Sequence, residues 1–154
     1  MAKKESLPCL PKNVQKILIA LADALILEPE DLKISERNEG MLHRCEILMQ
    51  EMPRYFRFVL RIAFFFFNNM TILFGFGIKN FVSLSPDAKR AYTDRWLKTK
   101  ITILREIFKA LRGLVMMTYF SHPDVWRYIG YDPASHVKER LVLRKRLVER
   151  KNLE

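Results

Sequence analysis

The sequence predicts an all-α fold, a single irregular helical domain of about five to six helices with a basic C-terminal helix. Hydrophobic residues make up 49% of the 154 residues, and only 5 residues are Gly. Leu, Ile, Phe, Lys and Arg recur at helical spacing rather than in alternation. A chain of this length has room for one core. We expect a flexible arm at residues 1–10, the helical domain at 11–133 and a charged helical tail at 134–154.

The first predicted helix begins near Pro11, because proline suits the first helical position. It ends before Pro29, which disfavours an α conformation at Glu28. Residues 28–40 are charged and end in Gly40, and we expect a connecting loop there. The apolar stripe of this helix consists of Val14, Ile17, Leu18, Leu21 and Leu25.

Two further helices are expected, from Met41 to Met52 and from Arg54 onward, separated by Pro53. Basic residues of the third helix lie on a different face from its apolar residues, either solvated or paired with carboxylates of a partner. The basic residues are Arg54, Arg57 and Arg61. The apolar residues, at helical spacing, are Phe56, Val59, Leu60, Ala63, Phe64 and Phe67.

The apolar segment Ile62–Ile78 is too short and too polar at its centre to predict a membrane span. It has 17 residues, with Asn68 and Asn69 in the middle, whereas a spanning helix needs about 20 mostly apolar residues. The helix should end near the two asparagines, and an apolar connection should follow. The four phenylalanines at 64–67 point around the whole helix, so one face packs internally and another must meet a partner or lipid.

Residues 85–130 predict a long helical stretch and a short helix. Ser85 fits a helix N-cap and Pro86 the first helical position. An amphipathic body follows to Ser121, and Pro123 then begins a short helical turn with Gly130 as its left-handed cap. The apolar stripe of the long body is Ile101, Leu104, Ile107, Phe108, Leu111, Leu114, Val115 and Thr118.

No arrangement in the sequence is typical of catalysis, cofactor binding or metal binding. The histidines at 43, 122 and 136 lack partners at ligand spacing. Cys9 and Cys45 are outside any C-x-x-C motif and are expected to be reduced thiols. The net charge of +10 is compatible with an anionic partner, but no nucleic-acid-binding signature appears. The sequence predicts a protein that is not an enzyme and does not bind nucleic acid.

Residues 81–133 contain aromatic and turn residues in a specific order, most clearly in YFSHPDVWRYIGYDP at 119–133. This block resembles the gluconate 2-dehydrogenase subunit 3-like family, the small helical subunits of flavin-dependent alcohol and sugar dehydrogenases. It is also similar to the N-terminal helical region of long-chain fatty alcohol oxidases. The matching residues are Phe81, Leu84, Ser85, Arg95, Trp96, Tyr119, Phe120, Ser121, Pro123, Trp126, Ile129, Gly130, Tyr131 and Asp132.

The resemblance implies a non-catalytic accessory subunit that stabilises or positions a large glucose–methanol–choline-type partner. That partner would carry FAD and the catalytic histidines, and this chain would hold no cofactor. The resemblance also implies packed anchors at Trp96 and Trp126 and a turn after Gly130 fixed by Tyr131 and Asp132. It further implies that Arg95 pairs with a carboxylate, either within this chain or on the partner. The residues predicted to bind the partner are Phe64, Phe65, Phe66, Phe67, Phe74, Phe76, Arg95, Trp96, Trp126 and Tyr131.

The N-terminal stretch lacks the twin-arginine signal found in many small subunits of sugar dehydrogenases. The expected location is therefore the cytoplasm or the inner-membrane surface. The alternative hypothesis is a peripheral membrane protein without an enzyme partner. In that case the Phe-rich segment would insert as a wedge, and the basic faces would bind anionic lipid.

Overall fold

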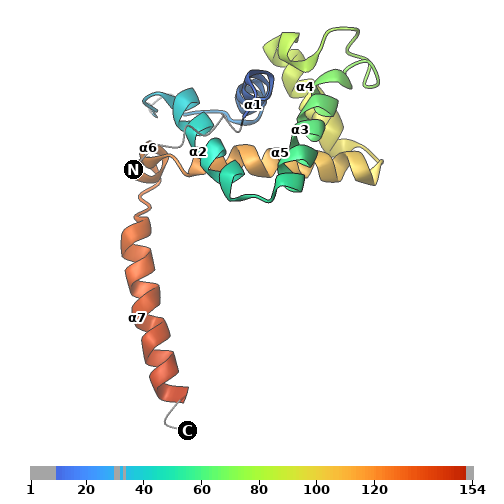
Figure 1. Ribbon diagram of the computed structural model, residues 1–154. Coiled ribbons are helices and arrows are strands. Elements are labelled where there is room, and N and C mark those ends of the chain that lie inside the picture. Colours follow the sequence, from blue (N-terminus) through green and yellow to red (C-terminus); the bar gives the residue numbers. More distant parts are fainter. Residues whose placement is uncertain (1–9, 30–31, 33, 152–154) are drawn as a thin grey trace, which may run out of the picture.

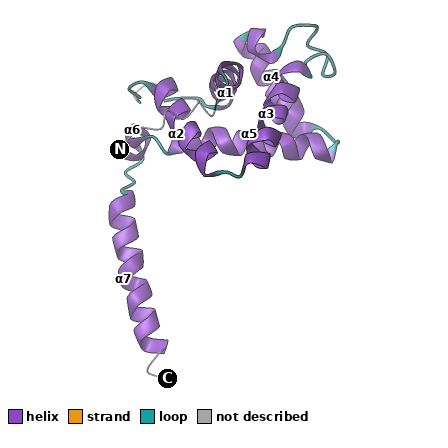
Figure 2. Cartoon of the chain, in the orientation of Figure 1, coloured by secondary structure: helices purple, strands orange, loops and turns teal. Residues whose placement is uncertain are grey.

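The computed structural model describes residues 10–29, 32 and 34–151, which form seven α-helices and one short 3₁₀ turn with no strand (Figures 1 and 2). The all-α prediction is confirmed. The helix count exceeds the expected five to six because Thr99–Ile101 divide the stretch after Ser85 into two helices. The elements are α1 (Lys12–Leu25), α2 (Arg37–Glu51), α3 (Arg54–Asn69), the 3₁₀ turn (Phe81–Ser83), α4 (Pro86–Lys98), α5 (Thr102–Phe120), α6 (Pro123–Tyr128) and α7 (Pro133–Lys151).

Helices α1 to α6 form a body with α1 and α5 at its centre, and α7 extends away from this body (Figure 1). Helix α5 contacts every other helix of the body, and α1 also contacts α3, α4 and the 3₁₀ turn. Leu10 is buried against this core, while residues 1–9 of the predicted arm lie outside the described residues. The buried apolar faces of the two central helices are Val14, Ile17, Leu18 and Leu21 of α1 and Leu104, Phe108, Leu111, Leu114 and Val115 of α5.

An aromatic cluster fills the space between α3, α4 and α5. The ring of Phe67 lies 4.7 Å from Phe81, 5.2 Å from both Tyr92 and Trp96, and 5.7 Å from Phe108, measured between ring centroids. The Tyr92 hydroxyl donates a 2.6 Å hydrogen bond to the carbonyl of Phe67. This bond gives one of the last carbonyls of α3 a partner. Burial raises the pKa of Tyr92, because the interior disfavours the phenolate.

Proline and capping residues set the helix boundaries much as the sequence predicts. The Ser85 hydroxyl accepts a hydrogen bond from the Ala88 amide at the start of α4. After α6, Gly130 adopts φ +68°, the left-handed conformation that favours glycine. Five of the seven helices begin at or directly after a proline: Pro11, Pro53, Pro86, Pro123 and Pro133.

Helix α2 begins at Arg37, earlier than predicted, so Gly40 lies inside the helix and does not end a loop. Two ion pairs hold the start of α2 in place. The Arg37 guanidinium lies 3.0 Å from the Asp23 carboxylate of α1 and 2.8 Å from the Glu28 carboxylate just after α1. Gly40 is needed for packing, because a Cβ there would lie 2.8 Å from the His122 ring. The absence of a side chain lets the α5–α6 junction approach α2.

Cys45 is fully buried in the core, and this burial raises the pKa of its thiol from 9.0 to about 12. Because only the thiolate is a good nucleophile, we expect Cys45 to react very slowly with a disulfide reagent at neutral pH. A Cys9→Ser variant isolates this thiol, and one equivalent should become reactive after denaturation. Rapid labelling of the native variant would contradict the buried position.

The same shift predicts a stability loss in alkali. The pKa of the Cys45 thiol is 9.0 in an unfolded chain and about 12 in the folded chain. The unfolded state therefore binds fewer protons in this range, and the free energy of unfolding should fall as the pH rises from about 9 towards 12. Urea titrations of Cys9→Ser and of Cys9→Ser with Cys45→Ala measure this slope, which should be smaller in the variant without Cys45.

Candidate docking surfaces

Three of the predicted partner-binding residues belong to the chain's own core. Phe64, Phe67 and Trp96 have no exposed surface, so their side chains do not reach a partner. The prediction that they are interface anchors is corrected accordingly. The reason is the direction of the helices: α3 turns Phe64 and Phe67 inward, and α4 turns Trp96 towards the same cluster.

Three other predicted residues are half-buried and fix the connection after α3. Phe66, Phe74 and Phe76 pack against the rings of Tyr92 and Trp96. The chain folds back over the cluster at this point because Gly75 and Gly77 take positive φ angles of +76° and +83°.

Arg95 holds this connection from α4. Its guanidinium donates to the Phe74 carbonyl and lies 4.8 Å from the centroid of the Phe76 ring. The resemblance implied a carboxylate partner for Arg95. Among the described residues its partners are a backbone oxygen and an aromatic face, which attracts a cation through its quadrupole, and a carboxylate on a partner protein stays a prediction.

Trp126 and Tyr131 lie at the corner where α5, α6 and the start of α7 meet. The Trp126 indole donates to the Phe120 carbonyl, and its ring lies 6.4 Å from Tyr131. Asp124 fixes the corner to the rest of the body, because it accepts a hydrogen bond from the Ser35 amide at 3.1 Å. Trp126 is half-buried and Tyr131 is exposed, so both remain candidates for partner contact.

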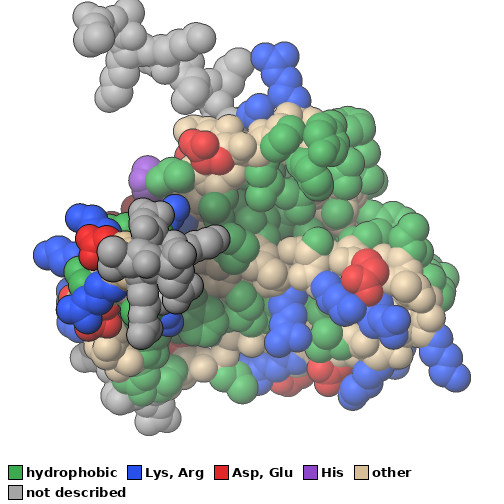
Figure 3. All heavy atoms as spheres, turned by 90° about the horizontal axis from the view of Figure 1, so that it is seen from below, with side chains coloured by type: hydrophobic (Ala, Val, Ile, Leu, Met, Phe, Trp, Pro, Cys, Tyr) green, Lys and Arg blue, Asp and Glu red, His purple; other side chains and the backbone are tan. Residues whose placement is uncertain are grey.

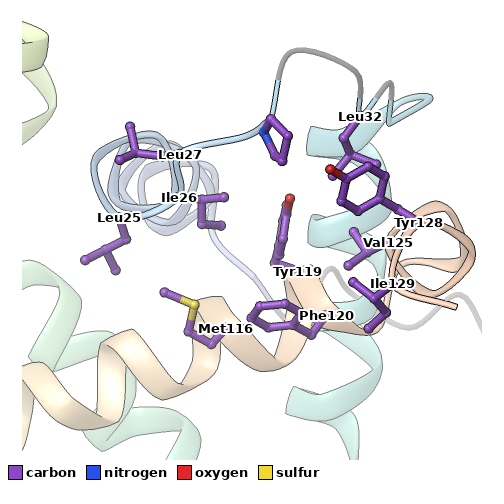
Figure 4. Close-up of a pocket in the computed structure, with 11 residues that line it drawn as sticks. Leu25, Ile26, Leu27, Leu32, Met116, Tyr119, Phe120, Val125, Tyr128 and Ile129 are labelled. Atoms are coloured by element: carbon purple, nitrogen blue, oxygen red, sulfur yellow. The ribbon is translucent and has the colours of Figure 1, made fainter. Parts of the chain in front are cut away.

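An apolar groove opens beside this corner, and we call it the corner groove (Figure 4). Its volume is about 290 Å³, and the end of α1 and the following residues face α5 and α6 across it. Burial, with the nearby Glu28 carboxylate, raises the pKa of Tyr119 at its floor. The lining residues are Leu25, Ile26, Leu27, Pro29, Leu32, Met116, Tyr119, Phe120, Val125, Tyr128 and Ile129.

Helix α7 leaves the corner and extends away from the body (Figure 1). Among the described residues it makes no extensive contact with another helix. Its side chains at 134–146, 148 and 149 are exposed, including apolar ones that the surface helix of a globular protein usually turns inward. The exposed apolar residues are Val137, Leu141, Val142, Leu143 and Val148.

A second apolar surface runs along the outer side of α3, and we call it the outer stripe. Figure 3 shows a broad hydrophobic area on the right half of the molecule, where α3 lies in Figure 1. The stripe borders an open apolar groove of about 480 Å³ between α3 and α5. Its members, all exposed, are Tyr55, Phe58, Val59, Ile62 and Phe65.

Sequence reasoning found only one member of the outer stripe as a partner-binding residue, Phe65. It placed Phe56 and Val59 on the inward face, whereas both are about half exposed. The missing signal was a second apolar face on the same helix. The apolar residues at positions 55, 58, 59, 62 and 65 also follow helical spacing. A single apolar stripe facing the core does not account for apolar residues on this second face.

No family model, curated protein or solved structure matches this chain. Within residues 10–29, 32 and 34–151, no helix combines the length and apolar character that crossing a membrane requires. The same residues contain no group of three His, Cys, Asp or Glu side chains placed to hold a metal ion.

Proposed function

We propose that this chain is a non-catalytic accessory subunit that docks on a flavin-dependent alcohol dehydrogenase or oxidase of the glucose–methanol–choline type. The partner would carry FAD and the catalytic residues, and this chain would stabilise or position it. The proposal includes a location in the cytoplasm or at the inner-membrane surface. The main support for this proposal is helix α7, which projects from the body and has exposed apolar side chains that do not pack extensively against another helix of the described residues.

Helix α7 supports a docking role because its exposure is energetically unfavourable in the free chain. A helix of 19 residues in water gains most of its stability from packing an apolar face against another element. Within the part of the chain that the structure describes, no element of the body packs extensively against it. Burial of Val137, Leu141 and Val148, which share one side of the helix, against a partner would supply that packing.

The corner groove supports the same role and connects it with the resemblance. The most specific segment of the resemblance, residues 119–133, supplies Tyr119, Phe120 and Ile129 of the groove. It also leads directly into α7. An open pocket beside exposed aromatic side chains is the usual form of an interface centre, where a few buried anchors dominate the binding energy. Groove and helix together would form one surface for a large partner.

The histidines of the chain support a structural role. His122 accepts a hydrogen bond from the Asp124 amide through Nδ1 at 3.2 Å and so caps α6. His136 lies beside the Tyr131 ring, at 6.1 Å between centroids. Two of the three histidines, His122 and His136, therefore have a local packing or capping partner. The chemistry of alcohol oxidation is assigned to the partner.

The proposal predicts a coloured complex. When the full chain is purified in mild detergent from the cells that make it, a second, larger polypeptide should co-elute. The complex should show flavin absorption bands that bleach when an alcohol substrate is added anaerobically. The control is a mock purification from cells that lack the tagged chain. A colourless chain that elutes alone at all stages would overturn the accessory-subunit proposal.

A further inference from the structure

The outer stripe of α3 remains largely uncovered within the described residues, although α3 itself is firmly held. Its inner face is fixed by Phe64 and Phe67 in the core, so the helix presents its outer side as a rigid surface. Phe65 remains 64% exposed, and the other members of the stripe are about half exposed or more. Exposed aromatic and branched side chains in one continuous stripe indicate a binding surface.

The charged residues of α3 and of the loop that follows it are all basic. Between Glu51 and Asp87 the sequence has no acidic residue. The basic residues in this interval are Arg54, Arg57, Arg61 and Lys79. On a helical projection the three arginines lie between the outer stripe and the buried face of α3. The stripe is thus an apolar surface with a cationic border on one side, and on its other side it borders the α3–α5 groove, which Glu106 also lines.

The loop after α3 carries further exposed apolar side chains. In Figure 1 it extends beyond the C-terminal end of α3. Ile72, Leu73 and Ile78 are exposed, and Ile78 has 92% of its surface in contact with solvent. Arg95 holds the loop through Phe74 and Phe76, so the exposed residues are carried by an anchored segment.

We propose that the outer stripe and this loop bind the surface of a bilayer that contains anionic lipids, with α3 lying in the interfacial plane. An interfacial helix buries its apolar face to a depth of about 5–10 Å while Lys and Arg contact lipid phosphates. Arginines beside an apolar, aromatic face are the pattern of an interfacial helix, and their charge complements the anionic headgroups of such a bilayer. This proposal goes beyond the accessory-subunit role and does not depend on it.

Vesicle binding of the full chain tests the proposal. The two probes are vesicles of phosphatidylcholine alone and of an equal mixture of phosphatidylcholine and phosphatidylglycerol. The chain should sediment with the mixed vesicles, bind the neutral ones much more weakly, and dissociate as salt rises, since salt screens the attraction. Absence of binding to the mixed vesicles at low salt would overturn the proposal.

Substitutions in the stripe locate the contact. Phe58→Ser and Phe65→Ser should each lower the partition coefficient at least about tenfold, because each removes an aromatic ring from the apolar face. Arg54→Gln and Lys79→Gln should each lower it roughly fivefold, the effect of one basic residue at an anionic surface. Circular dichroism shows whether each variant keeps its helices. Phe58→Ser and Phe65→Ser remove rings at two positions of the same stripe, so both should weaken vesicle binding.

Helix α7 provides the matched control, because it is also basic and carries exposed apolar residues. Val142→Ser should leave the partition coefficient unchanged within about twofold. Loss of vesicle binding in Val142→Ser but not in Phe58→Ser or Phe65→Ser would overturn the assignment to α3. A further contradicting outcome is self-association: a dimer in solution that Phe65→Ser converts to a monomer, without vesicle binding, would assign the stripe to a second copy.

A spectroscopic variant reports insertion directly. Phe65→Trp should show a blue-shifted emission on addition of the mixed vesicles, relative to the unsubstituted chain, because the indole leaves water. Brominated lipids should quench this emission. An unshifted spectrum for a variant that still sediments with vesicles would place the stripe outside the membrane contact and contradict the proposal.

Discussion

Phe67→Ala is expected to lower the free energy of unfolding by about 3–5 kcal/mol, the range for truncating a large buried aromatic side chain. Phe67 contacts the rings of Phe81, Tyr92, Trp96 and Phe108. Its removal leaves a cavity among rigid rings that cannot collapse easily. A domain of this size has a total free energy of unfolding of about 5–15 kcal/mol, so the variant should retain only a small part of its stability. Urea unfolding followed by circular dichroism measures the change.

Phe65→Ala is the matched control, because it makes the same chemical change two residues away on the same helix. Phe65 is largely exposed, so the free energy of unfolding should change by no more than about 0.5 kcal/mol. Equal losses in both variants would contradict the orientation of α3. Equal vesicle partition of Phe65→Ala and the unsubstituted chain would instead count against the lipid contact of the outer stripe.

The helix boundaries were largely predictable because they depend on local chemistry. Proline lacks an amide hydrogen and fits helix starts. The Ser85 hydroxyl caps the start of α4, and Gly130, which has no side chain, adopts the left-handed conformation after α6. The start of α2, which was missed, depends on residues far apart in the sequence. Gly40 reads locally as a helix breaker, but its lack of a side chain serves contact with His122, 82 positions later.

The docking residues were less predictable than the fold, for a related reason. Four consecutive phenylalanines point in every direction around a helix, and the pattern alone does not say which ones face the core. The inward orientation of Phe67 depends on residues of other helices. Its ring packs against the rings of Tyr92, Trp96 and Phe108. The corner groove was missed because it forms between the end of α1 and α6, segments about 100 residues apart.

The exposure of α7 predicts the largest effect on association. In the double variant Leu141→Asp with Val148→Asp, the dissociation constant for the flavoprotein partner should rise at least a hundredfold, roughly tenfold or more for each lost apolar contact. Each new carboxylate would also be costly to bury without a partner. Thermal unfolding of the chain should hardly change, because α7 makes no extensive contact with the body. Titration of the partner with the labelled chain measures the dissociation constant.

Val142→Asp is the matched control for this prediction. Val142 lies on the same exposed helix, but its position is turned about 100° from Leu141, away from Val137 and Val148. If α7 docks through the side formed by Val137, Leu141 and Val148, the control should weaken binding far less than the double variant. Equal losses would mean that α7 is surrounded by the partner rather than docked on one side. Unchanged binding in the double variant would remove α7 from the interface and leave the corner groove as the remaining contact.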